Sequence, residues 1–130
     1  MASNVLNSML KNKWSASTTA ANVTATASVG SPGTQSRHVL ETLVYSIYNN
    51  GVSTGLQFTL QAQVRHASVA GTLIFALDHN VPSSTVHNVQ LAGLGIPGKR
   101  GSGLVAFFNT VIGSVTASMN IAGWTDDANG

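Results

Sequence analysis

The sequence predicts an all-β protein, an antiparallel β-sandwich or jelly roll of about eight strands. Apolar and polar residues alternate in several short stretches, most clearly in residues 56–64, where apolar side chains alternate with Gln and Thr. This period of two is typical of a strand with one buried face. The stretches are evenly spaced and separated by Gly, Pro, Asn and Ser, and no long helical pattern is convincing. Together these observations favour a sandwich.

The first half of the chain contains three further candidate strands. Residues 13–18 and 23–29 are rich in Thr, Ala and Ser and predict strands near a sheet edge. The apolar residues of 38–48 fit a helical stripe as well as a strand face. We favour a strand there, because Asn-Asn-Gly at 49–51 supplies a turn and the rest of the chain has a strand pattern.

The second half adds four candidate strands. Residues 72–78 are apolar on both faces and predict a central strand, and residues 85–91 predict a shorter one. Residues 104–112 are again apolar on both faces, whereas residues 115–124 alternate apolar and polar side chains. The Gly-Ser pair at 113–114 fits a two-residue turn, so we expect these last two strands to form a hairpin.

The first twelve residues differ from the rest of the chain. We expect residues 1–12 to be an N-terminal arm and residues 13–130 to be a single β-sandwich domain. The apolar residues of the arm have helical spacing: Val5, Leu6, Met9 and Leu10. Because so short a helix is marginal alone, the arm must dock, either on its own sandwich or on a neighbouring subunit.

Charge is scarce in this composition. Only 8% of the 130 residues are Asp, Glu, Lys or Arg, against about 25% in an ordinary soluble domain, while roughly a third are Ser, Thr, Asn or Gln. The formal net charge is only +2, so a nucleic-acid partner bound by a basic stripe is not expected. The chain has no cysteine, which excludes disulfides and thiolate-bound metals. No apolar run is long enough to predict a membrane span, and no signal peptide is evident.

Two short motifs resemble catalytic or phosphate-binding patterns. Residues 51–55 fit G-x-S-x-G with Ser53 as nucleophile, but that chemistry needs a strand-to-helix turn, and here a strand follows. Residues 93–99 fit G-x-x-x-x-G-K, but Arg100 stands where a P-loop needs Ser or Thr. We interpret the first motif as a hairpin loop and the second as a flexible surface loop. Lys99 and Arg100 form the densest positive charge, which could meet an acidic patch on a partner.

No catalytic, cofactor-binding or metal-ligating residue is predicted. The histidines are His38, His66, His79 and His87. A metal site needs three or four converging ligands, so we expect each histidine to be hydrogen-bonded or exposed. Asp126 and Asp127 lack an oxygen-rich calcium loop around them. Trp14 and Trp124 would stack on a sugar if exposed, or anchor the sandwich if buried.

Three segments resemble a family of small tailed-phage virion proteins that are cysteine-free and rich in small residues. Arg-His-Val-Leu at 37–40 is similar to the family's entry into a strand. Gly-Ile-Pro-Gly at 95–98 is similar to its glycine-rich loop before the final hairpin. Asn-Ile-Ala-Gly-Trp at 120–124 is similar to its closing Gly-aromatic pair, although Tyr is commoner than Trp at that place.

The resemblance implies a jelly-roll head decoration, or cement, protein on the outside of an icosahedral phage capsid. Such a protein is made in the host cytoplasm, binds the major capsid protein, forms a homo-oligomer, often a trimer, and is no enzyme. The residues expected at its partner interface are Val5, Leu6, Met9, Leu10, Lys99 and Arg100. The alternative is a receptor- or glycan-binding sandwich of a tail fibre or lectin-like protein, with Trp14, Trp124 or the 93–103 loop facing the sugar. A small hydrolase using Ser53 is a third, less favoured hypothesis.

Overall fold

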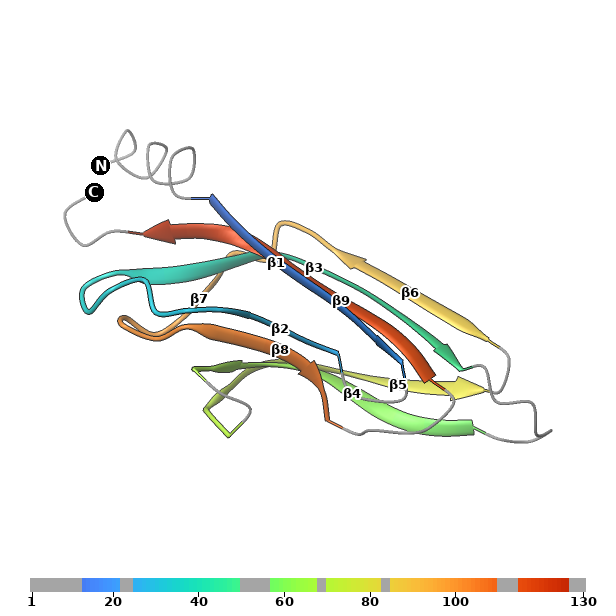
Figure 1. The fold of residues 1–130 in the computed structure, drawn as a ribbon. Helices are drawn as coiled ribbons and strands as arrows, with labels where there is room; N and C mark the ends of the chain where they lie inside the picture. The colour runs from blue at the N-terminus through green and yellow to red at the C-terminus, as the bar shows by residue number, and fades with distance from the viewer. Residues whose placement is uncertain are drawn as a thin grey trace.

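The protein is an all-β sandwich in which two antiparallel sheets pack face to face (Figure 1). The computed structural model describes residues 13–21, 25–49, 57–67, 70–82, 85–109 and 115–126. The strands are β1 (Lys13–Ala21), β2 (Thr26–Val29), β3 (Arg37–Asn49), β4 (Gln57–His66), β5 (Leu73–Pro82), β6 (Val86–Leu91), β7 (Ile96–Pro97), β8 (Leu104–Phe108) and β9 (Val115–Asp126).

The strand order is that of a jelly roll. The first sheet has the order β1-β9-β3-β6, with the short β7 paired to β3, and the second has the order β2-β8-β4-β5. The early strands pair with the late ones in reverse sequence, β1 with β9, β2 with β8, β3 with β6 and β4 with β5, as in one long hairpin rolled up. The predicted fold class is confirmed, and the ambiguous segment 38–48 is a strand.

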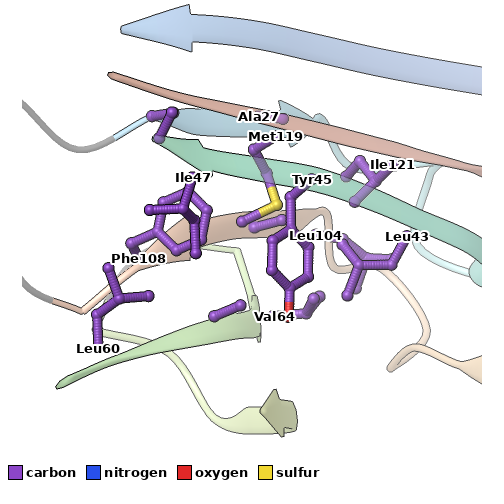
Figure 2. Close-up of a cluster of buried hydrophobic side chains, with 14 of the residues drawn as sticks. Ala27, Leu43, Tyr45, Ile47, Leu60, Val64, Leu104, Phe108, Met119 and Ile121 are labelled. Carbon is purple, nitrogen blue, oxygen red and sulfur yellow. The ribbon is translucent and has the colours of Figure 1, made fainter. Parts of the chain in front are cut away.

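The core lies between the sheets because polar and apolar residues alternate along the paired strands. In β9, Val115, Ala117, Met119 and Ile121 are buried, while the residues between them are partly exposed. Paired strands place residues of one face in rows, so that Ala16, Ile121, Leu43 and Leu91 lie side by side on the inner face. Figure 2 shows inner side chains of this sheet, among them Leu43, Tyr45 and Ile121, in one cluster with Leu60, Val64, Leu104 and Phe108 from the second sheet.

A β-bulge at Glu41 changes which residues of β3 face the core. The register of β3 against β9 shifts between Leu40 and Thr42. Beyond the bulge, Leu43 and the alternate residues that follow it point inward, and before it Leu40 and His38 do so, and all are buried. Since an extra residue reverses the alternation, the bulge keeps both halves of this long strand on the same core.

Three of the topological predictions are wrong. The strands expected to form a hairpin around residues 113–114, β8 and β9, belong to different sheets, because the jelly roll returns β9 to pair with β1 and β3. The same applies to the motif at 51–55, since β3 and β4 also lie in different sheets. The segment predicted to be a central strand, β5, is at the edge of its sheet, and Leu73 is 43% exposed. Apolar residues on both faces of this segment therefore indicate neither full burial nor a central place in the sheet.

Gly123 marks the closest approach of two strands and a side chain. A Cβ atom at this position would lie 1.9 Å from the Val39 carbonyl oxygen and 2.8 Å from the Trp14 ring. Trp14 is opposite Gly123 in the β1–β9 pair and packs against the core. Only glycine therefore leaves room for both the indole and the Val39 carbonyl at this point.

We predict that Gly123→Ala lowers the free energy of unfolding by about 2–3 kcal/mol, because the added methyl group must displace backbone or the indole. Urea denaturation followed by tryptophan fluorescence measures the change. Gly30→Ala is the matched control, since a Cβ there meets no atom within 4 Å. A Gly123→Ala variant as stable as the Gly30→Ala variant would contradict the packing described.

Candidate functional site

The four histidines do not gather at one place, and among the described residues no group of three or more His, Asp or Glu side chains could hold a metal ion. His38 is buried and fully hydrogen-bonded. Its Nε2 donates to the Gly30 carbonyl at 2.7 Å, so in a neutral ring Nδ1 accepts from the Thr125 hydroxyl at 3.0 Å. The Trp14 ring packs edge-on against it, with 5.2 Å between centroids. His38 thus joins the loop after β2 to β3 and β9, which is a structural role.

His79 and His87 form a cluster with Tyr45 between the sheets. Tyr45 reaches from β3 toward the second sheet (Figure 2), and its hydroxyl is hydrogen-bonded to Nε2 of His79 on β5. The His87 ring on β6 packs edge-on against His79, with 5.9 Å between centroids. Burial raises the pKa of Tyr45 to about 12. Burial and the nearby His87 lower the pKa of His79, which the Asp78 carboxylate offsets in part.

The glycine-rich loop between β6 and β8 is fixed by hydrogen bonds to neighbouring segments. Part of it forms β7, which pairs with β3. The Gly98 N–H donates to the His38 carbonyl at 2.7 Å, and the Gly101 N–H donates to the Ser36 carbonyl at 2.8 Å. A Cβ at Gly103 would lie 2.3 Å from the Val29 carbonyl oxygen. The glycines therefore allow the backbone to pack closely. The sequence predicts a flexible surface loop, whereas in the structure hydrogen bonds hold this loop against neighbouring segments.

The positive charges of the described residues lie at one end of the sandwich. This basic end carries the starts of β1, β3 and β8 and the end of β4, to which loops 30–36 and 98–103 are hydrogen-bonded. Its cations are Lys13, Arg37, Arg65, Lys99 and Arg100. One described carboxylate accompanies them, that of Asp126, which accepts from Arg37 Nε at 3.1 Å. The connections at the opposite end contain no Asp, Glu, Lys or Arg in the sequence.

The outer face of the five-stranded sheet has an uncharged region, although its strands also contain Lys13, Arg37, Glu41 and Asp126. The side chains of this region form three rows: Ser15, Ala122 and Thr42; Ser17, Asn120, Val44 and Gln90; and Thr19, Ser118, Ser46 and Asn88. The Ser46 and Ser118 hydroxyls are 2.8 Å apart. Tyr48 and Val86 pair beyond these rows and are 42% and 54% exposed. We call this surface the neutral face.

The outer face of the second sheet carries a chain of aligned hydrogen bonds along β4. Arg65 Nε donates to the side-chain oxygen Oε1 of Gln63 at 2.8 Å, and Gln63 Nε2 donates to Oε1 of Gln61 at 2.6 Å. Gln61 Nε2 then donates to an Asp78 carboxylate oxygen at 2.8 Å. Every bond points the same way, from the guanidinium to the carboxylate, so each amide polarises the next. This chain holds Arg65 at the basic end.

The tryptophans have different environments, and neither is a freely exposed stacking platform. Trp14 packs against the core and also lines an open hollow on β1 and β9 with Lys13, Ser15, Ala122 and Gly123. Trp124 pairs with Val39, which is buried outside the main core cluster. The indole N–H groups of both tryptophans are buried, and neither has a hydrogen-bond partner within the part of the chain that the structure describes.

The structure places part of the predicted partner interface. Lys99 and Arg100 are exposed at the basic end. The remaining predicted residues, Val5, Leu6, Met9 and Leu10, lie outside the described residues, as do Ser53 and Asp127. Sequence reasoning missed that Lys13, Arg37 and Arg65 share the end with Lys99 and Arg100. In the sequence, each of these residues lies beside the end of a predicted strand. Which strand ends share one end of the sandwich depends on the topology, and the sequence pattern does not give it.

Comparison with known proteins gives weak structural similarities. An arabinoxylan arabinofuranohydrolase of glycoside hydrolase family 43 from Bacillus subtilis is 18% identical, with a TM-score of 0.42 over 83% of this chain, which spans only 20% of that protein. The module CsCBM6-3 from Clostridium stercorarium, in complex with cellobiose, is 16% identical, with a TM-score of 0.40 over 78% of this chain and 67% of the module. The coat protein of Tobacco streak virus is 9% identical, with a TM-score of 0.36 over 88% of this chain and 87% of the coat protein.

The fold class rests on the strand order given above, because similarities at this level extend no further. No protein-family model matches the sequence, and no curated protein matches it. Within the described ranges, no helix has the length and apolar character needed to cross a membrane.

We predict that the free energy of unfolding decreases as the pH falls below about 6.5, the ordinary pKa of histidine. Burial lowers the pKa of both His79 and His66 in the folded protein, and the Lys99 charge adds to the effect at His66. The unfolded chain therefore binds protons first, and stability is lost progressively between the ordinary pKa and the lower folded-state values.

Urea denaturation at a series of pH values measures this slope. We expect His79→Gln and His66→Gln each to reduce it and the double substitution to reduce it further. The exposed neighbour Asn80, changed to Gln, is the control and should keep the wild-type slope. The slope in question is the change of the free energy of unfolding with pH below about 6.5. If the double substitution leaves this slope unchanged, the assignment to these two histidines is wrong.

Proposed function

We propose that the protein is a non-enzymatic structural subunit that binds the outside of an icosahedral phage capsid as a decoration protein and stabilises the shell. The observation that carries the proposal is the neutral face, whose three rows consist mainly of Ser, Thr, Asn and Gln and contain no ionised group. Removing such residues from water costs less free energy than removing ions. A face of this kind suits a subunit that packs closely against copies of itself or a shell.

Two further features support assembly. Tyr48 and Val86 add an exposed apolar pair to the neutral face, and aromatic residues are enriched in protein interfaces. The resemblance in segments 37–40, 95–98 and 120–124 points to the same class of virion protein. In this proposal the protein is a homo-oligomer, with a trimer favoured, and its partner is the major capsid protein.

The proposed contacts come from several parts of the chain. The arm residues Val5, Leu6, Met9 and Leu10 anchor the subunit, and Lys99 and Arg100 contact the partner. Many copies on a lattice bind tightly even when each contact is weak, because avidity multiplies them. The scarcity of charge fits this proposal. Repulsion between like charges keeps free proteins apart in solution, and a subunit bound to other protein surfaces has little need of it.

The second candidate function is glycan or receptor binding by a tail-fibre or lectin-like module. The hollow beside Trp14 favours it, since it combines part of an indole ring with Lys13 and Ser15. Sugars bind where an aromatic surface and a few polar groups converge. Nucleic acid and membranes are not proposed as partners.

Cryo-electron microscopy of the tailed phage that encodes this chain tests the proposal. We expect jelly-roll density on the outside of the head, in symmetric clusters over the junctions between capsid subunits, and we expect mass spectrometry to find the chain in purified heads. Density confined to the tail, or heads without the chain, would overturn the decoration function. A glycan array read in parallel gives the second candidate its own outcome, and saturable sugar binding would favour it.

A further inference from the structure

We infer that the basic end is a preformed docking surface for an acidic protein surface. The sandwich then binds its partner through this end, and the opposite end points away from the partner. The inference rests on the proposed function in one respect, namely that the partner is taken to be the shell. It goes further by naming the end of the molecule that makes the contact and the chemistry that the partner must offer.

The first argument is the distribution of charge. Five of the six Lys and Arg residues of the chain are described, and all five lie at the basic end, where Arg37 pairs with the Asp126 carboxylate. The other described carboxylates are those of Glu41, in the bulge of β3, and Asp78 on β5. The sixth basic residue, Lys11, and the acidic Asp127 lie outside the described residues and cancel in formal charge. The three neutral rows of the sheet face carry no charge, and the connections at the opposite end contain no charged residue in the sequence, so the positive charge of the described residues is concentrated at one pole. Such a charge distribution orients a protein as it approaches an oppositely charged surface.

The second argument is that the loop bearing Lys99 and Arg100 is held rigidly before any partner binds. The Lys99 N–H donates to Nδ1 of His66 at 3.4 Å. An Arg100 guanidinium nitrogen donates to the Gln35 carbonyl, and the Ser31 hydroxyl donates to the Gly101 carbonyl at 2.8 Å. These bonds link the loop to two other segments of the chain. Binding then costs little loop-ordering entropy, which strengthens a contact made by only a few charges.

The third argument concerns the class of partner. Three of these cations already make hydrogen bonds or ion pairs within the chain. Arg37 pairs with Asp126, Arg65 donates to Gln63, and Arg100 donates to Gln35. Lys13 and Lys99 are exposed. Nucleic acids need many cations free to neutralise successive phosphates. A compact carboxylate patch on a protein matches this small and partly neutralised surface better.

The test compares variants of equal net charge. Lys99→Gln/Arg100→Gln removes two positive charges from the basic end, whereas Thr26→Asp/Asn80→Asp adds two negative charges at exposed positions of the second sheet. Binding of the full chain to immobilised poly-L-glutamate is measured by biolayer interferometry at increasing salt. We expect the first variant to bind about fivefold more weakly, which corresponds to about 0.5 kcal/mol for each of two exposed ion pairs. The second variant should bind within about twofold of wild type.

Equal weakening by both variants would overturn the inference, since net charge rather than the basic end would then control binding. Binding to duplex DNA in preference to poly-L-glutamate would also overturn it, in favour of a nucleic-acid surface. Co-sedimentation with undecorated phage heads separates this inference from the proposed function. If the wild type fails to bind heads while the poly-L-glutamate result holds, the decoration function fails alone. If heads bind the Lys99→Gln/Arg100→Gln variant as well as wild type, the docking inference fails alone.

Discussion

The register between β3 and β9 is the constraint on which the rest of this structure depends. These strands form the centre of the five-stranded sheet and are paired from Arg37 with Asp126 to Asn49 with Val115. The pairing directs Met119, Ile121 and their partners into the core and leaves neutral residues outside. A slip of one residue would exchange the two sets, placing hydroxyl and amide groups in the core at a cost of several kcal/mol in total. The bulge at Glu41 preserves this division along the whole strand.

The same register separates the surfaces by chemistry. The outer rows of the five-stranded sheet consist mainly of the uncharged residues Ser, Thr, Asn and Gln. The described Lys and Arg residues lie instead at or near strand ends or in loops. Because the jelly roll brings alternate strand boundaries to one end, cations far apart in the sequence gather there. Hydrogen bonds from His38, Gly98 and Gly101 join the loops of that end into one surface. A neutral face and a basic pole are therefore two consequences of one topology.

Much of the fold could be predicted from local patterns, and the site could not. Alternation identified the strands, and the Asn-Asn-Gly turn decided that residues 38–48 were not a helix. The Gly-Ser pair at 113–114 indicated a turn but carried no information about which sheet follows, so the predicted hairpin was wrong. Lys99 and Arg100 stood out because they are adjacent, whereas Arg37 and Arg65 joined them only through long-range pairing. The hydrogen bonds that fix the glycine-rich loop likewise join segments far apart in the sequence.

A disulfide tests the central register most directly, because the chain has no cysteine of its own. Ser46 and Ser118 are opposite each other in β3 and β9, with hydroxyls 2.8 Å apart, so Ser46→Cys/Ser118→Cys should form an intramolecular disulfide on oxidation. Ser46→Cys/Asn120→Cys, displaced by two residues on the same face, should not. Peptide mapping under non-reducing conditions identifies the bond. A disulfide in the displaced pair and none in the direct pair would contradict the register and, with it, the division into core and neutral face.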